Sequence, residues 1–109
     1  PAPWQSDARG QLFYCKSVMW LRLGNKDRAL FEWGCASRGL EEAYEQAVSA
    51  QAAHNVLRIA ARKVVRHHTE FATHFPTQDP YEKDIWGHIL SGIYATIPEL
   101  EIGAPVAYG

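Results

Sequence analysis

Three arginines at every fourth position form the most prominent candidate site in this chain. Arg58, Arg62 and Arg66 would lie along one side of a helix, because residues four apart stack on adjacent turns. Guanidinium groups in such a row can donate hydrogen bonds to phosphates or to carboxylates of a protein surface. The alternative is an ordinary solvated face, paired with the acidic residues of segment 41–45. The row therefore predicts a contact surface for an acidic protein or for nucleic acid.

Histidines supply the second kind of candidate chemistry. His68 and His88 fall within the apolar stripes of two expected helices, so they could line a pocket that holds an acid or a base. Each is also typical of a core histidine with satisfied hydrogen bonds. Another group, His67, Glu70 and His74, could share a helix side. Its order matches neither HExxH nor the ExxH of di-iron bundles, so we expect no metal and no cofactor.

A third candidate site combines aromatic and basic side chains in residues 11–23. As a β-strand this segment has one mostly apolar face and one mixed face. The mixed face carries Tyr14, Lys16, Trp20 and Arg22. Aromatic side chains beside arginine are typical of protein-interface hot spots and also of sheets that stack nucleic-acid bases. The alternative is that the C-terminal tail or a helix covers this face. We predict a partner-binding sheet face at these four residues.

The elements that must position these residues begin with a predicted β-hairpin. Segments 11–23 and 28–36 have strand-like composition, and the Gly-Asn-Lys-Asp segment 24–27 between them is typical of a turn. A lone hairpin is marginal in water and leaves its strand edges unpaired. This predicts a covering element or a homodimer that pairs through the hairpin. Residues 1–10 are expected to form a flexible N-terminal segment.

Three amphipathic helices are expected after the hairpin. The first would begin with Gly39 as its N-cap and end near Ala52. Residues 56–75 show a clear 3.6-residue period. The pattern leaves open whether 40–75 is one bent helix or two, although the poorly joined apolar stripes favour two.

The last helix has the clearest boundaries in the sequence. Asp79 is a good N-cap, Pro80 suits the first helical position, and Pro98 ends the helix. A short C-terminal edge strand is possible in 100–108, where Pro105 argues against a central strand. Strands followed by helices predict an α+β fold, with residues 11–109 as a single domain.

Composition narrows the class of protein. The chain has 109 residues with 47% hydrophobic and 12% aromatic residues, which is enough for one packed core. Its net charge of −1 argues against a protein whose main task is wrapping nucleic acid. Cys15 and Cys35 would lie on neighbouring strands, so two reduced cysteines are favoured and one disulfide stays open.

These observations favour a small non-catalytic module that recognises the surface of a larger protein. It would be an inhibitor, adaptor or accessory subunit, a class that mobile genetic elements also carry. The phosphate-binding glycine motifs and the GxSxG elbow are absent from the sequence, which argues against an enzyme. Two alternatives stay open: a nucleic-acid-binding dimer that uses the arginine row, and a small enzyme or ligand-binding protein with a histidine-lined pocket. We expect a cytoplasmic setting and no membrane partner.

Overall fold

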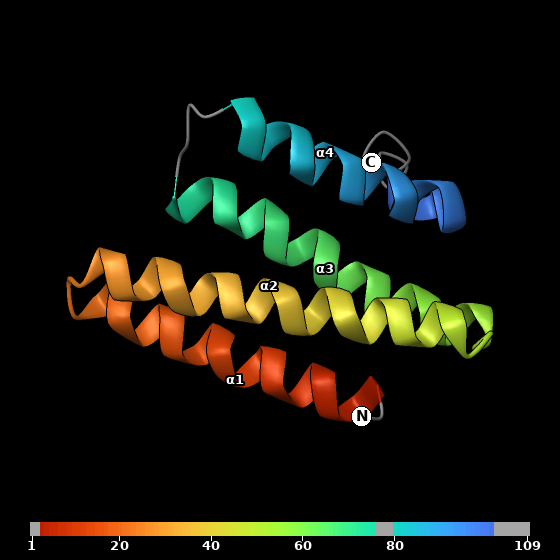
Figure 1. Ribbon diagram of the computed structural model, residues 1–109, viewed down its shortest axis with the longest axis horizontal. Coiled ribbons are helices and arrows are strands. Elements are labelled where there is room, and N and C mark those ends of the chain that lie inside the picture. The colour runs from red at the N-terminus through yellow and green to blue at the C-terminus, as the bar shows by residue number, and fades with distance from the viewer. Residues whose placement is uncertain (1–2, 76–79, 102–109) are drawn as a thin grey trace.

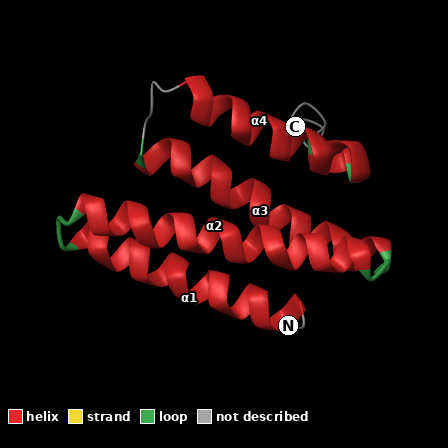
Figure 2. Cartoon of the chain, viewed as in Figure 1, coloured by secondary structure: helices red, strands yellow, loops and turns green. Residues whose placement is uncertain are grey.

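The protein is helical throughout the part of the chain that the structure describes. In this computed structural model, residues 3–75 and 80–101 are described, with side chains for 8–75 and 86–101. The elements are α1 (Pro3–Arg22), α2 (Lys26–Ser49), α3 (His54–His74), α4 (Pro80–Thr96) and a short 3₁₀ helix, η1 (Pro98–Leu100). No strand occurs within the described ranges (Figure 2). The predicted α+β fold with an N-terminal β-hairpin is therefore wrong, because the chain forms a helical bundle.

The four helices lie in chain order as an open array rather than a closed bundle (Figure 1). α1 and α2 form a helical hairpin, α2 packs against α3, and α3 packs against α4. Among the described residues, the backbone of α1 closely approaches only that of α2, and α1 does not reach α4. One long side of α1 and one groove between α2 and α4 are therefore left uncovered.

The helical hairpin occupies the two segments that were predicted as strands. Both helices carry apolar residues on more than one side, which hides the helical period. Along α1, Val18 and Leu21 pack against a buried cluster while Leu12 and Met19 are exposed. Apolar residues on both the buried and the exposed side of a helix can resemble the alternating pattern of a β-strand. Because no strand edge is present in the described part, the reason given for a dimer through a β-hairpin no longer holds.

The turn between the predicted strands is real, but it joins two helices. Gly24 has a φ of 83°, a left-handed conformation that glycine adopts without a steric penalty. Asn25 is the N-cap of α2, and its side-chain oxygen accepts a hydrogen bond from the backbone N–H of Arg28 at 3.0 Å. The helix therefore begins at Lys26, and Gly39, the predicted N-cap, lies buried inside it. The expected boundary at residue 10 falls inside α1.

The remaining helices agree more closely with their sequence patterns. α2 ends at Ser49 and α3 begins at His54, so segment 40–75 contains two helices, as the apolar stripes favoured. α4 begins at Pro80 and ends before Pro98. Asp79 and most of the possible edge strand at 100–108 lie outside the described residues.

The core consists of two apolar clusters. One joins α2, α3 and α4 through Leu40, Ala61, Val64, Ile93 and Ile97. The other is centred on Trp33, which is fully buried and packs with Ala29, Phe71 and Phe75. Truncating a buried tryptophan of this kind typically costs about 3–5 kcal/mol of stability. These clusters hold the array together and fix which side chains are left on its surface.

Both cysteines are free thiols: Cys15 is exposed and Cys35 is half-buried. None of the helices within the described ranges combines the length and the apolarity needed to cross a bilayer.

Candidate functional site

The predicted aromatic–basic face does not exist as one surface, because a helix separates residues that a strand would place together. Tyr14 points towards α3, where its hydroxyl donates to a carboxylate oxygen of Glu70 at 2.8 Å. Its ring meets the edge of Trp33 with the centroids 5.2 Å apart. Trp20 is half-buried against the Trp33 cluster. Both aromatic residues therefore belong mainly to the packing of α1 on its neighbours.

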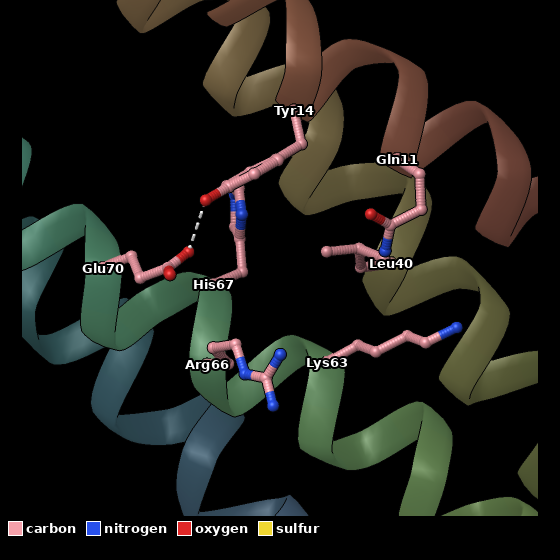
Figure 3. A pocket seen from close by; sticks show the side chains of 7 residues that line it. All are labelled: Gln11, Tyr14, Leu40, Lys63, Arg66, His67 and Glu70. Carbon is pink, nitrogen blue, oxygen red and sulfur yellow. Dashed lines mark hydrogen bonds between the residues drawn. The ribbon is translucent and has the colours of Figure 1, made fainter. Parts of the chain in front are cut away.

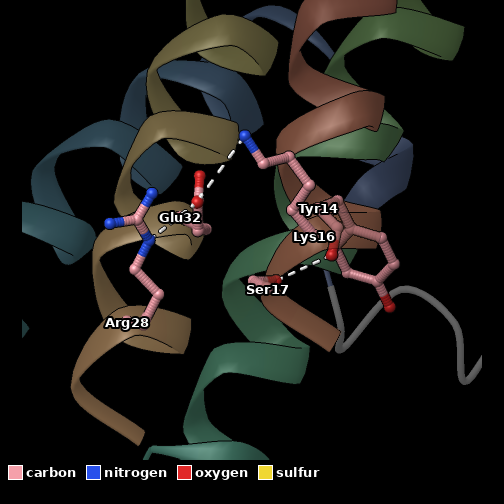
Figure 4. Close-up of polar contacts among 5 residues, drawn as sticks. All are labelled: Tyr14, Lys16, Ser17, Arg28 and Glu32. Carbon is pink, nitrogen blue, oxygen red and sulfur yellow. Dashed lines mark hydrogen bonds and ion pairs between the residues drawn. The ribbon is translucent and has the colours of Figure 1, made fainter. Parts of the chain in front are cut away.

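The two basic residues of that predicted face are separated as well. Lys16 Nζ lies 3.7 Å from an oxygen of Glu32, whose side chain is 1% exposed (Figure 4). Arg28 Nε donates to the same oxygen at 3.2 Å. Arg22 is exposed in the last turn of α1, where a cation interacts favourably with the helix dipole. Lys16 thus helps to neutralise a buried carboxylate, and Arg22 alone of the four is fully on the surface.

The two candidate pocket histidines lie in different environments. His68 is buried, and its Nε2 donates to an oxygen of Glu41 at 2.9 Å. Its ring packs against Trp86. His88 is exposed and lines a surface groove between α2 and α4. His68 therefore has the surroundings of a core histidine, and His88 is the only one of the two that reaches an open groove.

The predicted group of His67, Glu70 and His74 does not form one site, because His67 and Glu70 bind different partners. His67 is buried, and its Nε2 donates to the backbone oxygen of Trp33 at 3.2 Å. Burial is the main reason why the pKa of His67 is lowered to about 4. Glu70 accepts a hydrogen bond from the Tyr14 hydroxyl. Among the described residues, no three metal-ligating side chains converge.

A small polar pocket lies between α1 and α3 beside this group (Figure 3). Its volume is about 140 Å³, and Tyr14, Arg66, His67 and Glu70 contribute to its walls. Lys63 and Arg66 line the pocket together with the Glu70 carboxylate, so its wall carries charges of both signs.

The arginine row lies on the surface of α3, and all three side chains are exposed. Arg58, Arg62 and Arg66 line one groove, together with Glu99 and Glu101. The carboxylates beside the row therefore come from the segment around η1 rather than from α2. Glu99 also accepts a hydrogen bond from His54 at 2.8 Å, and this bond lowers the pKa of Glu99. Two carboxylates in the groove weaken its attraction for phosphates, which disfavours nucleic acid at this row.

A groove that the sequence patterns did not indicate lies along the α1–α2 hairpin. Its volume is about 570 Å³, and its walls include Arg9 and Phe13 of α1 with Leu30, Phe31, Gly34 and Arg38 of α2. Phe31 is 61% exposed, whereas Trp33, two residues away, is fully buried. As a strand these two rings would share a face, but a helix turns them to different sides. The helical placement therefore brings a large aromatic ring to the surface.

Four cationic side chains lie in this groove or beside its aromatic rings. Lys16 Nζ lies 5.0 Å from the centroid of the Phe13 ring, and the Arg28 guanidinium lies 5.7 Å from that of Phe31. Arg9 pairs with Glu42 at 2.7 Å. Arg38 is exposed and forms no ion pair with any residue in the described ranges. The groove therefore combines exposed aromatic surface with a basic rim.

No known family, no curated protein and no solved structure matches this chain. Evidence for function therefore comes from the surface of the molecule. Its most distinctive feature is the groove between α1 and α2.

Proposed function

We propose that this protein is a small non-catalytic binding module that recognises an acidic amphipathic helix of a larger protein. The observation that carries the proposal is the groove along α1 and α2, where exposed Phe31 and Leu30 lie between basic side chains. Large exposed apolar residues with a polar rim are typical of protein-interaction sites. Aromatic residues and arginine also dominate the binding energy at such sites.

The dimensions of the groove suit a helix. Along α2 its walls extend from Leu30 to Arg38, which corresponds to about 12 Å of helix at 1.5 Å per residue. A partner helix could place apolar residues at i, i+3, i+4 and i+7 against Phe31 and Phe13. Gly34 leaves additional room, since a Cβ placed there would meet nothing within 4 Å.

The cations beside the groove favour a partner helix that carries acidic residues. Arg38 has no ion pair in the described ranges, and Lys16 and Arg28 share one buried carboxylate, that of Glu32. An acidic flank on the partner would supply the missing anions, and complementary charge also accelerates association. A second copy docked through this same groove would bring the two basic rims together. The groove therefore favours a different chain with acidic residues.

A peptide selection tests this proposal. A displayed library of helical peptides, selected against the whole chain, is expected to enrich amphipathic sequences that carry Asp or Glu beside the apolar stripe. The Phe31→Ala variant should then bind those peptides at least about tenfold more weakly, which is within the range of interface hot spots. Ile59→Ala is the matched control, because Ile59 is 56% exposed and does not line the groove. Enrichment of basic peptides, or equal binding by Phe31→Ala, would contradict the proposal.

A further inference from the structure

A second groove lies between α2 and α4, away from the groove proposed for the acidic partner. Its volume is about 530 Å³. The apolar part of its wall is formed by Tyr44 and Val48 of α2, Val64 of α3, and Ile89 and Ile93 of α4. Glu45 of α2 lines the same groove and is exposed. The groove therefore combines an apolar interior with an acidic side.

The open arrangement of the helices explains why this groove is uncovered. In a closed four-helix bundle, a helix would lie beside both α2 and α4. Here α1 packs on α2 but does not reach α4, and α2 and α4 are separated by α3 (Figure 1). The groove is lined over about two turns of each flanking helix, as the spacing from Glu41 to Ser49 and from His88 to Thr96 shows. Its shape and length therefore suit one further helix.

The exposed side of α1 has the pattern that such a helix needs. Leu12, Cys15, Met19 and Leu23 follow one another at intervals of three or four residues, so they form one stripe along the helix and the residue after it. Leu12, Met19 and Leu23 are 58%, 49% and 67% exposed, and Cys15 is exposed as well. A continuous apolar stripe on the outside of a helix is typical of an interface.

The charges on the two surfaces are complementary. Arg22 lies on α1 beside Met19 and Leu23, and it forms no ion pair with any described residue. Glu45 in the groove likewise has no ion pair within the described ranges. The α1 face therefore offers an unpaired positive charge, and the α2–α4 groove offers an unpaired negative charge.

We propose that the α2–α4 groove of one copy binds the exposed face of α1 from a second copy. The stripe around Met19 would cover the exposed part of Val48 and of Ile89, and Arg22 would face Glu45. When each copy also offers its own α1 face to the groove of the other, the assembly closes as a symmetric dimer in which both surfaces are used twice. This proposal is independent of the proposed function, since the groove beside Phe31 shares no lining residue with the α2–α4 groove or with the stripe on α1.

A charge-reversal series tests this contact by sedimentation equilibrium of the whole chain. The unsubstituted protein is expected to self-associate as its concentration rises. Arg22→Glu alone and Glu45→Arg alone should each weaken self-association by about tenfold, because like charges would then face each other. The double variant should recover most of the loss, since it restores an opposite pair in the reversed order. Circular dichroism of each variant confirms that the helices remain folded.

An apolar pair of variants completes the test. Met19→Glu should weaken self-association by about a hundredfold, because it places a carboxylate in the proposed apolar contact and near Glu45. Val56→Glu is the matched control, since Val56 is 48% exposed and lies outside both surfaces. A chain that stays monomeric at every accessible concentration would overturn the proposal. So would an assembly that Met19→Glu and Val56→Glu weaken equally.

Discussion

The ring of His67 stacks on the ring of Trp33, with the centroids 4.8 Å apart and the planes inclined by 25°. His67 Nε2 also donates to the backbone oxygen of Trp33 at 3.2 Å. Its other ring nitrogen, Nδ1, is buried and has no hydrogen-bond partner among the described residues. The neutral tautomer with its proton on Nε2 therefore fits this site, and the charged form would bury a donor without an acceptor.

This contact predicts that the fold loses stability as the pH falls below 6.5. Burial lowers the pKa of His67 to about 4, against 6.5 in the unfolded chain. Between these values the unfolded state binds the additional proton, so unfolding becomes more favourable as the pH decreases. For this one group, the free energy of unfolding should be about 2 kcal/mol lower at pH 5 than at pH 7.

Urea unfolding of the protein and of His67→Gln at both pH values measures this effect. The glutamine amide can still donate to the Trp33 oxygen but does not titrate. We expect the loss between pH 7 and pH 5 to shrink by about 2 kcal/mol in the variant. The same pH dependence in both proteins would show that His67 is not the responsible group.

A second prediction concerns the buried carboxylate of Glu32 (Figure 4). Its two cationic partners, Lys16 and Arg28, are about half-exposed, and its second oxygen has no partner in the described ranges. Because desolvation of a buried charge often exceeds the Coulombic gain, Glu32→Met should be neutral or should stabilise the protein by about 1–3 kcal/mol. Chemical denaturation measures the change.

Removing the two cations instead of the carboxylate should destabilise the protein. Replacing both Lys16 and Arg28 by methionine keeps most of the alkyl packing but leaves Glu32 buried without a cation. We expect this variant to lose about 3 kcal/mol. A large loss of stability for Glu32→Met, together with no loss when Lys16 and Arg28 are both replaced by methionine, would contradict this account. It would mean that desolvation of the Glu32 carboxylate does not outweigh its ion pairs.

Two glycines in the helical hairpin predict opposite responses to alanine. A Cβ on Gly10 would lie 3.1 Å from both the backbone nitrogen and the Cγ of Leu40, so α1 and α2 would have to move apart. Gly10→Ala should therefore destabilise the protein by about 1–2 kcal/mol. At Gly34 the Cβ would enter open space, so the higher helix propensity of alanine should stabilise by about 1 kcal/mol. Thermal unfolding that shifts in the same direction for both variants would contradict this placement of α1 on α2.

The N-cap of α2 gives a fourth prediction. Asn25→Ala removes the side-chain oxygen that accepts the Arg28 N–H, so it should cost about 1 kcal/mol. Asn25→Asp keeps an acceptor and adds a negative charge at the helix N-terminus, and it should therefore retain or slightly increase stability. Equal destabilisation by both substitutions, measured as a shift of the unfolding midpoint, would argue against a capping role.

The sequence was sufficient to predict α3 and α4 but not α1 and the first half of α2. The region around Val64 has its apolar residues on one stripe, so the 3.6-residue period is visible, and the proline at position 80 marks where α4 begins. In the hairpin, Trp33 faces the core and Phe31 faces solvent. Local periodicity could not distinguish these two rings, because the exposed apolar residues blur the pattern. The glycine and asparagine of the turn were recognised, but their chemistry suits helix capping as well as a β-turn.

The candidate sites could also be predicted only where the residues lie close together in the sequence. The spacing of Arg58, Arg62 and Arg66 placed them on one side of a helix, and the structure does bring all three to one surface groove. The carboxylates that share this groove come from Glu99 and Glu101, about forty residues away, so local spacing could not identify them. The groove beside Phe31 requires α1 and α2 to pack as helices, and it was therefore hidden once these segments were interpreted as strands.

The most direct test of the proposed function is a charge exchange between the groove and its ligand, measured by isothermal titration calorimetry. An acidic amphipathic peptide from the selection is titrated into the protein and into Arg38→Glu, together with a peptide in which lysines replace the acidic residues. We predict that the acidic peptide binds the unsubstituted protein and that Arg38→Glu shifts the preference towards the lysine peptide. An unchanged preference in Arg38→Glu would contradict recognition through this basic groove.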